Sequence, residues 1–191
     1  MLGRLPQTLK VAGKEYRIRS DFRSVLRIIE AFGDDALDDR EKTYVLLKQL
    51  YTDFDKMPAE HITEAYKQAA WFLRCGQPEE TKEHRKTVYW QQDEPLIFPA
   101  VNKAAGTEVR LTKYMHWWTF MGFFQSIDNE STYGCVLMLR QKRMKGKKLE
   151  KWEQEYWTAN RDICEPETGT HEKDMQDTMQ DLFNSLLGGD G

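Results

Sequence analysis

The sequence predicts a mainly α-helical protein: a bundle of about six to seven helices, a small N-terminal β-hairpin and a C-terminal amphipathic helix. Apolar residues recur at helical i, i+3, i+4, i+7 spacing through most of the chain. Glycines and prolines separate these stretches at intervals typical of helix lengths. The 191 residues, 40% apolar and 31% charged, suit a soluble protein of one domain, or of one domain plus appendages.

The first 33 residues predict the hairpin and the first helix. Short β-prone runs at 8–11 and 16–18 flank Gly13, which favours a tight turn. Because two strands alone are marginally stable, the hairpin should pack on helices. Ser20 or Asp21 can cap the helix that follows. Its apolar stripe consists of Phe22, Val25, Leu26, Ile29 and Phe32.

Two further helices complete the predicted N-terminal part, residues 1–76. Asp38 and Glu41 have the spacing of a capping box and should open the second helix. Its apolar residues are Tyr44, Leu47, Leu50, Tyr51 and Phe54. The third should begin near Met57 and Pro58, with Pro58 close to its first position. Its stripe consists of Ile62, Ala65, Tyr66, Ala69, Ala70 and Leu73.

Residues 77–92 are polar and lack periodicity, which predicts a linker or long loop. An aromatic-rich helical half, residues 93–164, should complete a domain of residues 1–164. Asp93 and Pro95 favour a helix start, and Pro99 should kink that helix or delay its start. The remaining expected helices are a ring-rich one around 117–124, one capped by Asn129 or Ser131 that runs to Met144, and a last one marked by Leu149, Trp152, Tyr156 and Ile163.

The ring-rich helix is the strongest apolar feature of the chain. Residues 114–124 hold seven aromatic or imidazole rings. A helix that is apolar nearly all round is buried on most sides, so it forms the centre of a core or keeps part of its surface for a partner. Its candidate partner-binding residues are Trp117, Trp118, Phe120 and Phe124.

Residues 165–191 should form a mobile acidic segment that contains an amphipathic helix at 174–187. Breaker residues at 165–169 separate it from the domain. A helix of about four turns is marginal alone, so it needs a surface to fold on, either its own domain or a partner. Its candidate partner-binding residues are Met175, Met179, Leu182, Phe183 and Leu186.

Motifs for catalysis, cofactors or metals are lacking. The sequence has no G-x-S-x-G, its four histidines are far apart, and no ligand spacing typical of zinc occurs. We therefore expect no catalytic residues, no cofactor and no metal. Three scattered cysteines do not suit a disulfide scaffold, the N-terminus lacks a signal-peptide core, and no apolar run could span a membrane. We expect a reduced, cytoplasmic protein.

Charge is distributed unevenly along the chain. Residues 140–151 carry seven cations against one carboxylate, whereas 165–191 carry seven carboxylates against one lysine. A further acidic cluster lies at 30–41. The basic run suits a solvated surface, a protein contact or, least favoured, phosphates of nucleic acid. The candidate residues for electrostatic contact are Arg140, Lys142, Arg143, Lys147 and Lys148.

Four stretches resemble a family of small proteins from tailed phages and prophages of Gram-positive bacteria. They read MLGRLPQTLKVAGKEYRIRSDFRSVLRIIEAF, DEPLIFPAVNKAAGTEVR with YMHWWTFMGFF, and KGKKLEKWEQEYWTANRDI, within residues 1–164. The family is similar to tail-assembly chaperones of long non-contractile tails. The resemblance implies a non-enzymatic protein of the host cytoplasm that binds the tape-measure protein and helps the tail-tube protein polymerise around it.

The resemblance supplies no residue-level binding site, and it leaves other functions open. One alternative is a structural tail or head completion protein that stays in the virion. A DNA-binding phage regulator is a third class and depends only on the basic run 140–151. Opposite charges within one chain also suit contacts between the subunits of a homo-oligomer, or between the acidic C-terminal segment and the body of the same chain.

Overall fold

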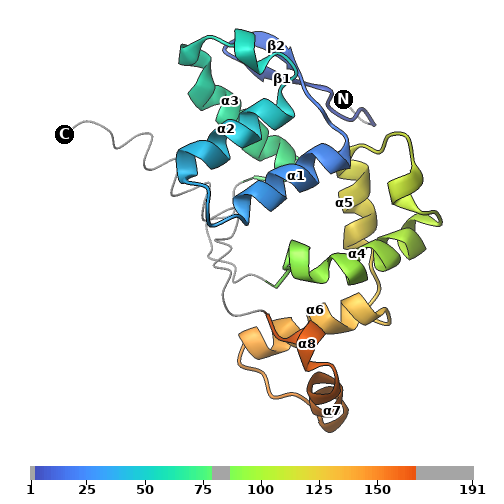
Figure 1. Cartoon of the computed structure of the whole chain (residues 1–191). Helices are drawn as coiled ribbons and strands as arrows, with labels where there is room; N and C mark the ends of the chain where they lie inside the picture. The colour runs from blue at the N-terminus through green and yellow to red at the C-terminus, as the bar shows by residue number, and fades with distance from the viewer. Residues whose placement is uncertain (1–2, 79–86, 167–191) are drawn as a thin grey trace. The chain divides into compact units, whose positions relative to one another are not determined.

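The computed structural model describes residues 3–78 and 87–166 and confirms a mainly α-helical fold with an N-terminal two-stranded hairpin (Figure 1). Its described part divides into two units. The first comprises residues 3–78 and 114–120, and the second comprises residues 87–113 and 121–166. The predicted helix at 174–187 lies outside the described residues, as do residues 79–86 of the predicted linker 77–92.

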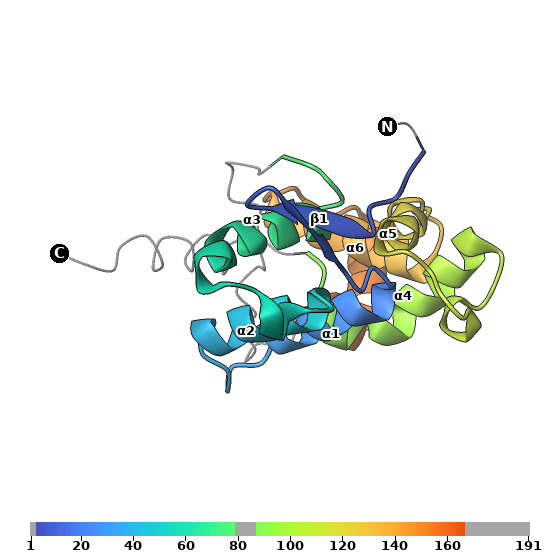
Figure 2. The same cartoon turned by 90° about the horizontal axis from the view of Figure 1, so that it is seen from above.

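The hairpin of the first unit consists of β1 (Thr8–Val11) and β2 (Lys14–Arg17), paired antiparallel. Both residues of the intervening turn, Ala12 and Gly13, have positive φ (47° and 79°). Such a two-residue turn matches the twist of the flanking strands. β1 packs on α3, and Figure 2 shows the strand lying across that helix. The buried hairpin side chains are Leu9, Val11 and Tyr16.

Three helices follow the hairpin: α1 (Phe22–Phe32), α2 (Asp39–Leu50) and α3 (Ile62–Leu73). Asp21 caps α1, and the capping box predicted for Asp38 and Glu41 is confirmed. α2 ends at Leu50, so the prediction that it extends to Phe54 is wrong; Phe54 begins a short 3₁₀ turn, η1 (Phe54–Lys56). A second turn, η2 (Ala59–His61), precedes α3, because Pro58 is extended (ψ 144°) and cannot belong to the first helical turn.

Residues 114–120 complete the first unit although they lie far along the chain. The N–H of Met115 donates to the carboxylate of Asp21 (3.0 Å), and its carbonyl accepts from the N–H of Phe22 (2.9 Å). Trp117 then donates its indole N–H to the carbonyl of Leu73 at the end of α3 (2.9 Å). These bonds join the start of α1 to the end of α3 through this short segment.

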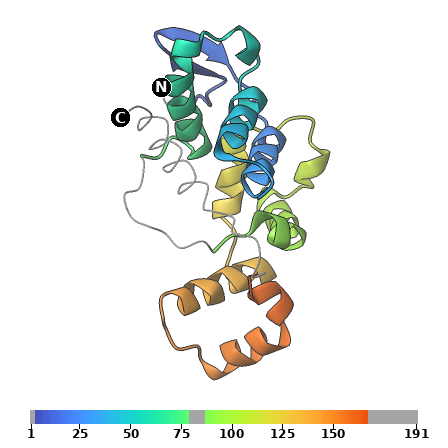
Figure 3. The same cartoon turned by 60° about the vertical axis from the view of Figure 1, so that its left-hand side comes forward.

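The second unit contains α4 (Trp90–Ala105), a 3₁₀ turn η3 (Val109–Leu111), the end of α5 (Trp117–Gln125), and then α6 (Thr132–Met144), α7 (Lys151–Ala159) and α8 (Arg161–Cys164). Figure 3 shows the α6–α7 turn at one end of the last three helices and α8 at the other. Val136, Leu139, Trp157 and Cys164 form the buried core of these helices.

Two boundaries in this unit differ from the prediction. α4 begins at Trp90 and runs through both Pro95 and Pro99, so the expected start near Asp93 was late. Both prolines are exposed, so water can reach the carbonyls that lack a helical N–H partner. The single last helix is in fact two, because Asn160 (φ −124°, ψ 41°) interrupts it. Of the two proposed caps for α6, the structure uses Ser131.

Candidate functional site

The first unit carries a partly accessible group of rings at the end of α3, the α3 aromatic cluster. It consists of Trp71, Phe72, His116 and Trp118. The Trp71 and Trp118 rings pack edge to face at 5.4 Å, and the Trp118 indole N–H donates to the Phe72 carbonyl (2.8 Å). Trp71 is 37% exposed. A Cβ at Gly76 would lie 3.0 Å from the Trp118 ring, so the turn after α3 fits closely against the cluster.

His116 is buried in this cluster as a neutral ring with a defined tautomer. Its Nδ1 accepts from the backbone N–H of Trp118 (3.0 Å), which places the proton on Nε2. Nε2 therefore donates to the carbonyl of Pro6 (2.9 Å). Burial lowers the pKa of His116 and outweighs the opposite effect of the Pro6 carbonyl.

The lowered pKa of His116 predicts a pH-dependent component of stability. The unfolded chain, with an ordinary histidine pKa of 6.5, binds the proton more readily than the folded chain does. Stability due to neutral His116 should be complete above that value and be lost as the pH falls through the lower folded pKa. Urea unfolding at pH 7.5 and 5.5 should show a larger loss of stability for the wild type than for His116→Gln. Equal losses would contradict this assignment.

The four predicted aromatic candidates differ in burial. Trp117 and Phe120 are 2% and 0% exposed, and Phe120 stacks on Phe22 at 4.7 Å, so both belong to the core of the first unit. Because both side chains are in the core, a partner cannot contact them while the chain is folded. Trp118 is half-buried in the α3 aromatic cluster, and Phe124 is half-buried in the second unit against Trp90. The candidates Met175, Met179, Leu182, Phe183 and Leu186 lie outside the described residues.

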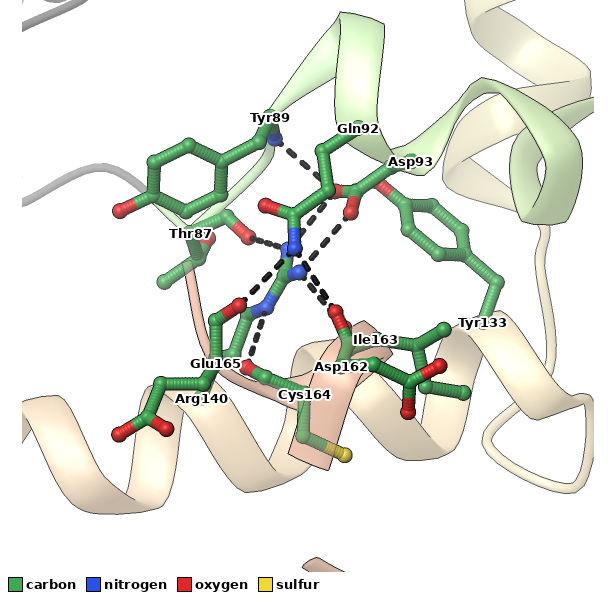
Figure 4. A network of polar contacts seen from close by, with 10 residues as sticks. All are labelled: Thr87, Tyr89, Gln92, Asp93, Tyr133, Arg140, Asp162, Ile163, Cys164 and Glu165. Atoms are coloured by element: carbon green, nitrogen blue, oxygen red, sulfur yellow. Dashed lines mark hydrogen bonds and ion pairs between the residues drawn. The ribbon is translucent and has the colours of Figure 1, made fainter. Parts of the chain in front are cut away.

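The second unit contains a buried polar network around Arg140 of α6 (Figure 4). Its guanidinium forms a bidentate ion pair with Asp93 of α4, at 2.7 and 2.9 Å. Three further bonds go to the carbonyls of Thr87 (3.0 Å), Ile163 (2.8 Å) and Cys164 (3.0 Å). All five N–H donors of the side chain are thereby used. Arg140, 4% exposed, thus joins α4, α6 and the end of α8.

Asp93 is equally well satisfied, which explains how the unit tolerates a fully buried carboxylate. Its oxygens also accept from the backbone N–H of Tyr89 (2.9 Å) and from the hydroxyl of Tyr133 (3.3 Å). Burial and the adjacent carboxylate raise the pKa of Tyr133, so this hydroxyl stays protonated and donates. Gln92 reinforces the junction by donating to the carbonyls of Asp162 (3.1 Å) and Glu165 (2.9 Å).

This network corrects the interpretation of Arg140 as part of a surface patch. The side chain is on the buried face of α6, four residues after Val136 and seven after Tyr133, both of which are buried. This helical spacing could have identified Arg140 as buried, but the neighbouring lysines indicated a solvated surface. The sequence pattern around Asp93 predicts only an acid near a helix start. Its partner lies 47 residues away in the chain, and spacing alone cannot show that contact.

A pocket of about 440 Å³ lies beside the network at the end of α6. Its lining residues are Tyr89, Arg140, Arg143, Met144, Trp157, Glu165 and Pro166. The exposed guanidinium of Arg143 lies over the ring of Trp157 at 4.3 Å. The pocket therefore combines apolar walls with a cationic rim. Across the described residues, no group of three or more His, Cys, Asp or Glu could hold a metal ion.

The other predicted electrostatic residues differ in accessibility. Lys142 is half-buried and forms an ion pair with the buried carboxylate of Glu153. Arg143, Lys147 and Lys148 are exposed. The structure thus leaves part of the basic run at the surface, around the turn between α6 and α7, and uses the rest to hold the second unit together.

Comparison with known proteins identifies the family of the chain. The family model described as Bacteriophage Gp15 protein matches residues 1–164, which include Arg140 and all the residues to which its side chain donates. Comparisons with curated proteins and with solved structures gave no match. No helix in the described parts of the chain is long and apolar enough to cross a membrane. With a match over most of its length, the chain belongs to the bacteriophage Gp15 protein family.

Proposed function

We propose that this phage protein is a tail-assembly chaperone. It binds the tape-measure protein in the host cytoplasm, assists polymerisation of the tail-tube protein around it, and catalyses no reaction. Membership of a bacteriophage family supports a role in the phage life cycle. The feature that supports the chaperone role is the α3 aromatic cluster, because it offers apolar ring surface that is already held in place.

The cluster has properties expected of an anchor for an apolar helix. Tryptophans dominate the binding energy of many protein interfaces, especially where their surroundings are rigid. Trp118 is held by the hydrogen bond from its indole to the Phe72 carbonyl and by close contact with the turn at Gly76. The accessible ring of Trp71 packs against it. Little conformational entropy is therefore lost when a partner covers these rings.

Co-expression with the tape-measure protein tests this function. The wild-type chain should keep the tape-measure protein soluble and co-purify with it, and Trp71→Ala should weaken the complex by about tenfold or more, as expected for an anchor tryptophan. The matched control is Tyr44→Ala on α2, which removes a 54% exposed ring outside the cluster. Both variants should show the circular dichroism of the wild type.

Two outcomes would contradict the proposal. The first is a tape-measure protein whose solubility does not depend on co-expression. The second is recovery of the chain in stoichiometric amounts from purified virions, because an assembly chaperone leaves the particle. Equal effects of Trp71→Ala and Tyr44→Ala would leave the function intact but place the binding surface elsewhere.

A further inference from the structure

We propose that the chain binds a second copy of itself head to tail, through two surfaces of opposite charge. The acidic loop, residues 30–41 from the end of α1 to the start of α2, belongs to the first unit. The basic turn, residues 143–151 from the end of α6 to the start of α7, belongs to the second. In the proposed contact, the acidic loop of one copy lies against the basic turn of the next. This association needs no client, so it can be tested independently of the proposed function.

The basic turn exposes cations that the described chain does not neutralise. Arg143, Lys145, Lys147, Lys148 and Lys151 are all exposed, with Glu150 as the only carboxylate of the turn. Within residues 87–166, Lys147, Lys148 and Lys151 form no ion pair, whereas Arg140 and Lys142 are paired with Asp93 and Glu153. The unpaired charges are therefore concentrated on the turn itself.

The pocket at the end of α6 adds a recess to the positive charge of this turn. Arg143 and Met144 belong to both the helix end and the pocket wall, and the ring of Trp157 lies under the Arg143 guanidinium. A cation held flat on an aromatic ring keeps its N–H groups directed to the side, where they can bind a carboxylate. The site suits a carboxylate-rich loop that also carries a small apolar residue.

The acidic loop has this composition and a fixed conformation. Residues 30–41 contain six carboxylates and a single arginine, and five of the six acids are exposed. Asp34 accepts from the backbone N–H of Ala36 (2.8 Å), and Asp38 accepts from that of Glu41 (2.8 Å). Ala36 is exposed at the centre, with two aspartates on either side within residues 34–39. The loop thus presents its charges without having to fold on binding.

A second copy accounts for both surfaces at once. The C-terminal segment 167–191, with six carboxylates and one lysine, could neutralise the basic turn but would leave the acidic loop unpaired. Contacts between two different surfaces of identical chains repeat from copy to copy and form rings or open chains. Because two loops bury little area, the association should be weak and strongly weakened by salt.

Analytical ultracentrifugation of the full chain with paired charge reversals tests the contact. At about 20 mM salt, on the order of a threefold longer screening length than at 0.15 M, the wild type should associate with rising concentration. Lys147→Glu with Lys148→Glu, or Glu30→Lys with Asp35→Lys, should each weaken association at least tenfold, because like charges then meet. All four changes together should restore it, as should an equimolar mixture of the two double variants. Arg4→Glu with Lys10→Glu, exposed elsewhere in the first unit, is the matched control and should associate normally.

Three results would overturn the inference. One is a monomer at every concentration at low salt. Another is weakened association in the basic-turn variant alone, which would point to the C-terminal segment as the occupant of that turn. The third is a failure of the mixture and of the fourfold variant to recover association. Trp71→Ala should leave self-association unchanged, which separates this contact from the proposed client surface.

Discussion

Replacing Arg140 by alanine should lower the free energy of unfolding by about 3–5 kcal/mol, the usual cost of leaving a buried charge without its partner. The variant leaves the carboxylate of Asp93, which is 0% exposed, without its bidentate partner, and it removes the donor from the carbonyls of Thr87, Ile163 and Cys164. Urea unfolding followed by circular dichroism measures the change. Arg140→Lys should also be strongly destabilising, because one ammonium group cannot replace five directed N–H donors.

The ion pair of Arg161 with Glu165 provides the control for this result. It is also an Arg–carboxylate pair of the second unit, but the arginine side chain is 72% exposed. Surface pairs of this kind contribute about 0–1 kcal/mol. Arg161→Ala should therefore be nearly neutral. If Arg140→Ala were equally mild, water would have to reach the Asp93 carboxylate, and the network could not have the structural role described above.

Replacing Gly134 by alanine should destabilise the chain by about 3 kcal/mol, at the upper end for added volume in a packed site. Gly134 lies in the first turn of α6, and a Cβ there would be 2.0 Å from the carbonyl oxygen of Asp128. That carbonyl cannot withdraw easily, because it accepts the hydroxyl of Ser131 (2.7 Å), and the Asp128 side chain accepts the N–H of Ser131 (2.7 Å). Thermal and urea unfolding should both show the loss.

Gly122 in α5 is the matched control, and its expected effect has the opposite sign. It is exposed, and a Cβ at this position would meet nothing within 4 Å. Gly122→Ala should stabilise the chain by about 0.5–1 kcal/mol, because glycine loses more backbone entropy than alanine does in a helix. If both substitutions destabilised the chain by similar amounts, the close approach of Asp128 would not explain the effect at Gly134.

Local chemistry in the sequence predicted much of the fold. Asp21, the Asp38–Glu41 capping box and Ser131 each mark a helix start that the structure confirms. Such signals act within a few residues, so a linear reading can detect them. The start of α4 was predicted late because its first turn, at Trp90, has no capping side chain. Asp93 accepts the N–H of Tyr89, and this bond is visible only once the helix is formed.

The candidate site was harder to predict, because it depends on contacts between distant segments. The sequence could show that the ring-rich helix needs apolar neighbours, but not that Phe22 covers Phe120 and leaves Trp118 half-exposed against Trp71. Arg140 was grouped with its charged neighbours in the chain, although its contacts are to α4 and α8. Long-range pairing, rather than local propensity, decided which residues are accessible.

Arg140 donates hydrogen bonds to the carbonyls of Ile163 and Cys164. These bonds determine where the chain can be shortened or extended. A stop codon before residue 163 would remove two acceptors and leave the buried Arg140 guanidinium with unpaired N–H groups. Fusing a fluorescent reporter after residue 166 would keep every one of those acceptors. The position after which a fusion is tolerated therefore depends on Arg140 in α6, more than twenty residues before the fusion point.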